Sequence, residues 1–460
     1  SYKCGSAGNQ DRRDNRWWKK LKGGAEMYTK EFQTIFAYAK DKVDETEILL
    51  SAGNSFSVRI NEQNVESFNY ADSKGIGVRI VKSGKVGYAY TEKFDAETFK
   101  KIVDEAIENA KFTEDDDVVI MENYPKNSDT PNVYSEELDK VDVTKKIQLA
   151  KDLEKYAKEV DERVFNVPYA VYADGKSYSR IANCKGLDKE DTQNYAYAYV
   201  AALSAEGDDK RMGMDFLISR DFGEFDPKKM AEAGVKKSTD LLNGKPAESG
   251  KYAVVFNNEM MATMLATFSG IFNAKSVQEG RSLLKGKIGQ KIANEKVTIV
   301  DDGLHPNGFS TSAFDSEGYP TEKTVLIENG VLKSYLHNTI TARKDGAIST
   351  GNGSRGYKGT LGINTSNFLI EAGEFKESDL FTKHEKIIEV VSLQGMHSGA
   401  NAISGDFSLG AQGFLWENGK RVHSLKPFTV SGNFLQMLSE VEAIADNFKF
   451  DMSSNGASSV

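Results

Sequence analysis

Alternation of residue character with a period of two is the feature that most restricts how this sequence can fold. The alternation is strongest over residues 195–199, where tyrosine and alanine take turns, and it recurs over residues 56–60 and 77–81. Successive side chains of a β-strand point to opposite faces of a sheet, so this period predicts strands with one face on a core and the other in solvent. The sequence therefore predicts antiparallel sheets.

The first half of the chain combines this pattern with helical ones. Asp95 precedes a helical stripe of apolar residues, and a polar stretch with two prolines at 113–141 indicates a linker. The predicted elements of this half are strands at 56–60, 77–81, 86–90, 169–173, 178–183, 195–205 and 213–220, and helices at 95–107, 143–160 and 227–242.

The second half is rich in glycine and mostly β in pattern. Two Asn-Gly pairs, at 329–330 and 418–419, predict hairpin turns because this dipeptide tolerates the positive φ angles of tight turns. The predicted elements of this half are strands at 252–256, 297–300, 324–327, 331–336, 387–393, 413–416 and 420–423, and helices at 259–272 and 434–448.

Strands outnumber helices and few strand pairs are joined by a helix, so the predicted fold class is α+β. Strand meanders backed by helices are expected in the N-terminal part, and a largely antiparallel β domain in the C-terminal part. A leader at 1–26 lacks the apolar centre of a secretory signal, and we place it outside the fold. The expected domains are N-terminal residues 27–245, with sub-blocks 27–112 and 142–245, and C-terminal residues 246–460.

Composition narrows the classes of partner. The net charge is −9 with acidic and basic residues interspersed, which argues against nucleic acid as a partner. No stretch approaches the roughly 20 apolar residues that span a bilayer, so no membrane partner is expected. Two cysteines, Cys4 and Cys184, are too few for a disulfide framework and suit a reducing compartment. The predicted location is cytoplasmic.

The sequence contains no catalytic motif that predicts an active site. A hydrolytic zinc site usually takes two histidines from one helix, but the nearest pair here is His384 and His397, and neither HExxH nor HExxxH occurs. The nucleophile-elbow pattern G-x-S-x-G is also absent. Asp301 and Asp302 are adjacent on a strand end and point to opposite sides, so a turn explains them better than a glycosidase carboxylate pair.

A glycine-rich loop at 343–365 is the remaining candidate for binding. Residues 351–356 match G-x-G-x-x-G, but the strand, helix and acidic residue that a dinucleotide site requires are missing. Glycines allow a substrate backbone to approach closely, and basic residues lie among them. The residues alone leave two interpretations open, a substrate-contacting loop and a flexible surface loop.

Ordered segments of the chain resemble the TldD/PmbA metallopeptidase family, known also as modulators of DNA gyrase. In the first half the resemblance is carried by Gly75-Ile76-Gly77-Val78-Arg79. In the second half it is carried by Glu279-Gly280-Arg281-Ser282, Val300-Asp301-Asp302-Gly303, Thr341-Ala342-Arg343-Lys344 and Gly405-Asp406-Phe407-Ser408. The order and spacing of these segments are specific, and they cover nearly the whole chain from Met27.

The family resemblance extends to one of its two branches. TldD-like members carry HExxxH on the helix after the strand that matches residues 252–256, and a cysteine in the late Gly-Asp-Phe-Ser region. Here that region reads Asn257-Asn258-Glu259-Met260-Met261-Ala262, with no histidine as far as Lys275, and the late region reads Ser408-Leu409-Gly410-Ala411. The chain is therefore similar to the PmbA/TldE branch, which lacks the metal ligands.

The resemblance implies a cytosolic subunit of a metallopeptidase complex that acts on unfolded peptides. No catalytic residue, metal ligand or cofactor is expected in this chain, and zinc is expected only in a TldD-like partner. The chain would supply part of the substrate groove, and the residues assigned to substrate contact are Arg343, Gly351, Asn352, Gly353, Arg355 and Asp406. Two alternatives remain, an independent homodimeric peptidase with a different site and a peptide-binding module without cleavage.

Overall fold

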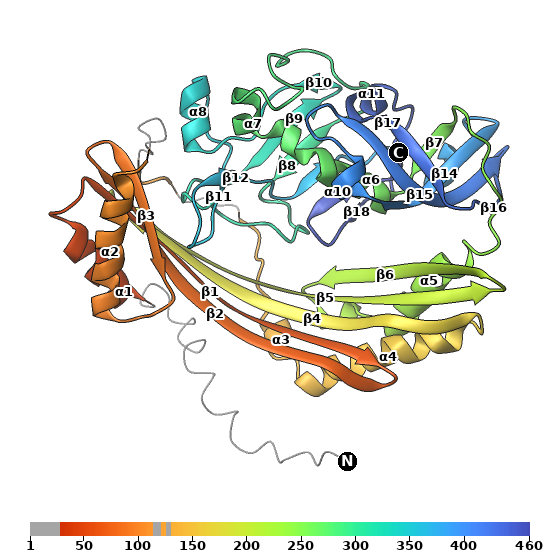
Figure 1. Ribbon diagram of the computed structural model, residues 1–460, viewed down its shortest axis with the longest axis horizontal. Coiled ribbons are helices and arrows are strands. Elements are labelled where there is room, and N and C mark those ends of the chain that lie inside the picture. The colour runs from red at the N-terminus through yellow and green to blue at the C-terminus, as the bar shows by residue number, and fades with distance from the viewer. Residues whose placement is uncertain (1–27, 114–120, 126–129) are drawn as a thin grey trace.

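One six-stranded antiparallel sheet, in the order β3-β2-β1-β4-β5-β6, organises the first half of the chain (Figure 1). The computed structural model describes residues 28–113, 121–125 and 130–460; the expected leader and parts of the expected linker lie outside these ranges. The strands are β1 Glu45–Asn61, β2 Asn64–Lys82, β3 Lys85–Thr91, β4 Val164–Asn183, β5 Asp188–Glu206 and β6 Asp209–Ser219.

The pairing of β1 with β4 joins the two predicted sub-blocks into this one sheet. Its register runs from Glu47 opposite Asn183 to Arg59 opposite Val171. Alternation within a strand reveals which residues share a face, but it does not reveal which distant strand lies beside it. The sequence therefore predicted two meanders where the structure has a continuous sheet.

Helices cover one face of the sheet. Their apolar stripes pack on the alternating residues of the strands, such as Ile48 and Leu50 at one end and Phe56 and Val58 at the other. Asp95 accepts a hydrogen bond from the Thr98 backbone N–H and so begins one helix as predicted. The main helices of this layer are α1 Thr29–Ala39, α2 Ala96–Ala110, α4 Val143–Val160 and α5 Pro227–Thr239, and the short ones are α3 Glu136–Asp139 and η3 Phe222–Glu224.

The C-terminal half builds two sheets around the central helix α6, Asn258–Phe268. One sheet has the order β10-β9-β8-β13-β19-β18 and the other β16-β15-β14-β7, with β17 beside β15. Their strands are β7 Ala253–Phe256, β8 Ile299–Asp302, β9 Lys323–Glu328, β10 Val331–Leu332, β13 Phe368–Ile370, β14 Lys386–Gln394, β15 Asp406–Glu417, β16 Lys420–Ser424, β17 Phe428–Asn433, β18 Lys449–Phe450 and β19 Asn455–Ala457.

Smaller elements complete this half. A two-stranded ribbon pairs β11 with β12, and five short helices and one 3-10 turn lie between the strands. They are β11 Gly353–Ser354, β12 Gly362–Ile363, η4 Ser269–Phe272, α7 Ala274–Gln278, α8 Thr339–Asp345, α9 Glu377–Leu380, α10 Met396–Gly399 and α11 Phe434–Ser439. Most pairings are antiparallel, while β7 with β14 and β13 with β19 are parallel.

The α+β fold class is confirmed, whereas one predicted helix is wrong in length. The helix expected at 434–448 ends at Ser439, because the following backbone extends and bonds to another segment. Gly373 N–H donates to Ala445 O at 2.9 Å and Asp446 N–H donates to Phe375 O at 2.7 Å. Tertiary pairing thus overrides the local helical pattern. No helix in the described ranges combines the length and the apolar character needed to cross a membrane.

The C-terminal half lies over the sheet face that the helices leave open (Figure 1). Two glycines of β2, Gly75 and Gly77, make the closest approach possible. A Cβ on Gly75 would lie 2.1 Å from the ring of Tyr357, and one on Gly77 would lie 2.3 Å from the carbonyl oxygen of Tyr357. The glycine pair of the family-like segment at 75–79 therefore has a packing reason.

Replacement of Gly77 by alanine should lower the free energy of unfolding by about 1–3 kcal/mol, since the Tyr357 backbone must move away. Chemical denaturation measures the change. Gly356→Ala is the matched control on the same loop, because a Cβ there meets open space. Equal stabilities of the Gly77→Ala variant and the control would contradict this account of the docking.

Candidate functional site

A buried ionic cluster joins the two halves of the chain. Glu47 of β1 lies between two guanidinium groups, with 2.8 Å from its Oε1 to Nη2 of Arg79 on β2, and it also pairs with Arg355 from the C-terminal half. The side chains of Glu47 and Arg79 are 1% exposed and that of Arg355 is 2% exposed. Burial lowers the pKa of Arg355 despite Glu47, whereas Glu47 and Tyr88 raise the pKa of Arg79 against the effect of its burial.

Three further carboxylates of the C-terminal half are withdrawn from solvent: Glu317 and Asp301 are buried and Asp315 is half-buried. Glu317 Oε1 lies 4.0 Å from Nη1 of Arg79 in the cluster. Glu317 accepts hydrogen bonds from the backbone N–H of Thr339, at 2.9 Å, and from the hydroxyl of Thr339. Asp315 accepts from the Gly353 N–H at 2.7 Å. Burial raises the pKa of both carboxyls, and for Asp301 it raises the pKa to about 6.

The glycine-rich loop contributes to this buried region with most of its predicted contact residues. Gly351 has φ 70°, and a Cβ on it would lie 2.6 Å from Pro320 O. The Asn352 amide donates to Asp301 Oδ2 at 2.6 Å. With the Gly353 N–H on Asp315 and the Arg355 guanidinium on Glu47, these groups are bonded within the chain. These contacts give each of the four residues a structural role.

The other two predicted contact residues lie elsewhere. Arg343 is exposed on α8, and Asp406 is exposed at the start of β15, where its Oδ1 accepts from the Asn433 amide at 2.9 Å. The six residues therefore do not form one site. Substrate contact by each of the six residues stays a prediction. Asp302 Oδ1 accepts from the Leu304 N–H at 3.0 Å, which is the turn proposed for the Asp301-Asp302 pair.

At the position where TldD-like relatives would hold zinc, this chain has an amide hydrogen bond and ion pairs instead. The Asn258 amide donates to Asn447 O at 2.8 Å. Glu259 pairs with Lys237 at 2.8 Å and with Lys449 at 2.9 Å, and these charges lower its pKa against the effect of burial. Within the described ranges, no three His, Cys, Asp or Glu side chains are grouped to hold a metal ion. This donor set does not fit the zinc site of the TldD-like branch.

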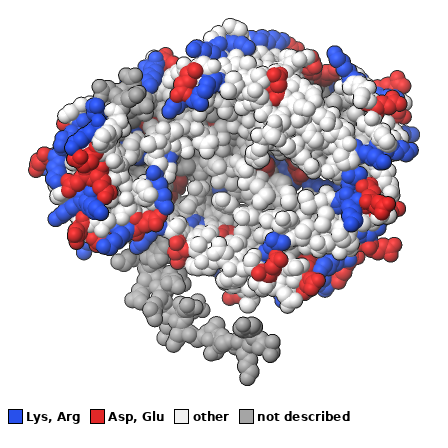
Figure 2. All heavy atoms as spheres, viewed as in Figure 1, with Lys and Arg blue, Asp and Glu red and all other residues white. Residues whose placement is uncertain are grey.

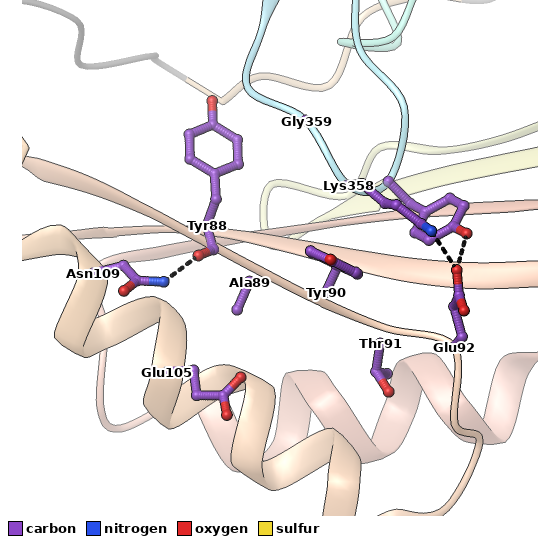
Figure 3. Close-up of a pocket in the computed structure, with 10 residues that line it drawn as sticks. Tyr88, Ala89, Tyr90, Thr91, Glu92, Glu105, Asn109, Lys358 and Gly359 are labelled. Carbon is purple, nitrogen blue, oxygen red and sulfur yellow. Dashed lines mark hydrogen bonds and ion pairs between the residues drawn. The ribbon is translucent and has the colours of Figure 1, made fainter.

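An open pocket of about 600 Å³ runs along the outer edge of β3 (Figure 3). Helix α2 forms one wall with Glu105 and Asn109, and the tip of the glycine-rich loop forms the other. Glu92 links strand and loop through Lys358 Nζ at 2.5 Å and the Tyr357 hydroxyl at 2.7 Å. The lining residues are Tyr88, Ala89, Tyr90, Thr91, Glu92, Glu105, Asn109, Tyr357, Lys358 and Gly359.

Sequence reasoning missed this pocket and the ionic cluster. Arg79 belongs to a segment that resembles the family, and tyrosines 88 and 90 alternate on one face of β3, so both signals were present in the sequence. Their partners are not recoverable from spacing, because Glu47 and Arg355 are 308 positions apart.

Family models match the chain along most of its length. Residues 46–110 match domain 1 of the PmbA/TldA metallopeptidases, residues 136–242 match the central domain and residues 249–460 match the C-terminal domain. The chain belongs to the PmbA/TldD metallopeptidase family. Membership supports a peptidase-related role.

Similarity to relatives and to solved structures supports the family membership. An uncharacterized protein of Methanocaldococcus jannaschii is 33% identical, covering 87% of this chain and 92% of the relative. The metalloprotease PmbA homolog of Haemophilus influenzae is 23% identical, covering 88% of each. A Thermotoga maritima structure, described as a candidate modulator of a DNA gyrase, superposes with TM-score 0.87 at 31% identity, covering 94% and 98%. TldE from Thermococcus kodakarensis gives 0.84 at 24% identity, covering 93% and 97%.

Glu47→Gln should lower the free energy of unfolding by about 3–5 kcal/mol, since it leaves two buried guanidinium groups without their shared carboxylate. Denaturant titration measures the loss. Glu66→Gln is the matched control on β2, because its pair with Arg59 is over a third exposed and should contribute less than about 1 kcal/mol. A loss from Glu47→Gln as small as the control's would show that the cluster does not hold the halves together.

Asp301 should make stability depend on pH. Its pKa is about 6 in the folded protein against an ordinary value of 3.8, so the folded state holds this proton more tightly than the unfolded state. The resulting stabilisation is present below pH 3.8 and is lost as pH rises through about 6, by about 2–3 kcal/mol.

Asp301→Asn should remove that part of the decline between pH 4 and pH 7. The measurement is the slope of unfolding free energy against pH, in wild type and variant. Asparagine also turns one acceptor into a donor, which shifts stability at every pH but not the slope. Identical slopes would refute the assignment.

Proposed function

We propose that this chain is a PmbA/TldE-like subunit of a cytosolic metallopeptidase complex that acts on unfolded peptides. A TldD-like partner would hold the zinc and perform the hydrolysis, and this chain would supply surface that holds the substrate. The supporting observation is the way the side chains at the start of helix α6 are bonded. The family match spans this helix, yet Asn258 bonds to a backbone carbonyl and Glu259 is neutralised by Lys237 and Lys449.

The open face of the N-terminal sheet supports a role in peptide contact. Tyrosines and methionines of β4, β5 and β6 that point to this face keep part of their surface exposed although the C-terminal half lies above them. Charged side chains gather toward the rim in Figure 2, while the middle of that view is hollowed and mostly uncharged. Aromatic and thioether groups adapt to varied apolar side chains, as unfolded peptides would require. The exposed members are Tyr169, Tyr195, Met212 and Met214.

The proposal assigns no chemical step to this chain. Its residues would bind and orient the peptide, since the described residues contain neither grouped metal ligands nor a catalytic motif of the kinds sought. The homologues called metalloprotease PmbA and TldD make a TldD-like partner the natural complement. A homodimeric enzyme and a binding module without cleavage are the competing outcomes.

Mixing the purified chain with a TldD-like protein of the same organism should produce a hetero-oligomer that cleaves an unfolded peptide. Light scattering coupled to gel filtration gives the assembly, and hydrolysis of a fluorogenic peptide gives the activity. The partner alone, the chain alone and a chelator-treated mixture are the controls. We expect activity in the mixture and its loss with chelator.

Metal analysis of the purified chain completes the test. We expect zinc well below one ion per chain, because the donor set at α6 does not fit it. Stoichiometric zinc together with peptide turnover by the chain alone would replace the proposal with the homodimeric enzyme. Peptide binding without cleavage, both alone and in the mixture, would favour the binding module.

A further inference from the structure

We propose that the outer edge of β3 binds an extended peptide segment by strand addition, in the pocket between α2 and residues 357–359, which we call the β3 slot. This inference rests on the proposed function only in taking an unfolded peptide as the occupant. It concerns this chain alone and requires no partner.

The backbone of β3 offers hydrogen-bonding groups on its outer side. Among the described residues the strand is the last of its sheet and pairs with β2 on one side only, with Gly77 opposite Tyr90 and Arg79 opposite Tyr88. In an antiparallel pair, alternate residues direct their N–H and C=O away from the neighbouring strand. The Tyr88 carbonyl accepts from the Asn109 amide of α2 at 2.8 Å, which identifies residue 88 as one whose backbone points outward.

The same alternation directs the backbone N–H and C=O of Tyr90 away from β2 and into the slot. In the part of the chain that the structure describes, side chains near the end of α2 cover this edge only up to residue 88. Thr113 Oγ1 donates to Val86 O at 2.7 Å, and Asn109 covers the next outward carbonyl. Edge strands are commonly covered or interrupted against unwanted pairing, so the end of this cover at Tyr90 is informative.

The walls of the slot suit an extended chain. The last four residues of β3, 88–91, and Glu92 just after the strand form its floor, with α2 on one side and the loop tip on the other, as Figure 3 shows. The ring of Tyr90 lies 6.1 Å from that of Tyr357, and 48% of Tyr90 is exposed. A strand laid along β3 would therefore meet backbone groups at the edge and aromatic rings on the loop side, which is the arrangement of strand-addition sites.

The charges of the slot select among peptides. Glu92 and Glu105 line it with one lysine, Lys358, that is already paired with Glu92 at 2.5 Å. Glu105 Oε1 lies 3.6 Å from Nζ of Lys101, which does not line the pocket, and the two side chains are 48% and 74% exposed. The surplus of carboxylates at the lining favours neutral or basic peptides over acidic ones, by an amount that salt would reduce.

A large side chain at position 359 should block the slot without displacing other parts of the chain. Gly359 lines the pocket, and a Cβ on it would meet open space. Gly356 also has open space around its Cβ position but does not line the pocket. Gly359→Trp should thus fill the slot without disturbing the fold, and Gly356→Trp is its matched control on the same loop.

The experiment measures binding of a fluorescein-labelled decapeptide of alternating threonine, valine and lysine to the isolated full chain, by fluorescence polarisation. We expect the wild type and Gly356→Trp to bind equally and Gly359→Trp to bind at least about tenfold more weakly. The same peptide with every second backbone nitrogen methylated should lose affinity by a similar factor, because strand addition uses those N–H groups. An acidic peptide with glutamate in place of lysine should bind more weakly than the basic one.

Several outcomes overturn the inference. These are no binding by the wild type, equal binding by Gly359→Trp, equal loss in the two tryptophan variants, and indifference to backbone methylation. Thermal unfolding of both variants verifies that they are folded. Failure of the chain to assemble with a TldD-like protein would refute the proposed function and leave this result standing. Assembly without binding in the slot would do the reverse.

Discussion

The carboxylate of Glu47 is the group on which the arrangement of the two halves depends. It is buried in the open face of the N-terminal sheet and shared by Arg79 of the same sheet and Arg355 of the C-terminal loop. Burying charges costs free energy unless each is paired, so a shared carboxylate ties the position of one half to that of the other. The loop that reaches Glu47 also forms a wall of the β3 slot, so the cluster anchors the loop to which that wall belongs.

Local structure was largely readable from the sequence, and long-range structure was not. Period-two alternation at 195–199 and the Asp95 cap predicted a strand and a helix start that the structure contains. The first half of β2 escaped prediction because residues 64–74 are polar or exposed and show no buried face. The helix expected at 434–448 was cut short by a backbone pairing with residues 373–375, which no local pattern encodes.

Only those features of the candidate site that depend on a short stretch of sequence could be predicted. The departure of α6 from HExxxH could be read directly, and the ion pairs of Glu259 give it a physical meaning. Four of the predicted contact residues in the glycine-rich loop, 351–353 and 355, bond or pack within the chain, whereas Arg343 is exposed. Glycines permit close approach of any backbone, and here the approach of Gly351 and Gly353 is to the chain itself. Only the tip at 357–359 opens onto the pocket.

The shared charge at Glu47 has a consequence for how relatives of this chain can diverge or be recombined. The family segment spanning 46–110 contributes Glu47 and Arg79 to the buried cluster, and the segment spanning 249–460 contributes Arg355. A chimera that joins these segments from different relatives keeps the buried charges paired only if the carboxylate and both guanidinium groups are all present. In this chain the first and third domains are separate sequence units that share one buried ionic cluster, and changes at positions 47, 79 and 355 should be found together.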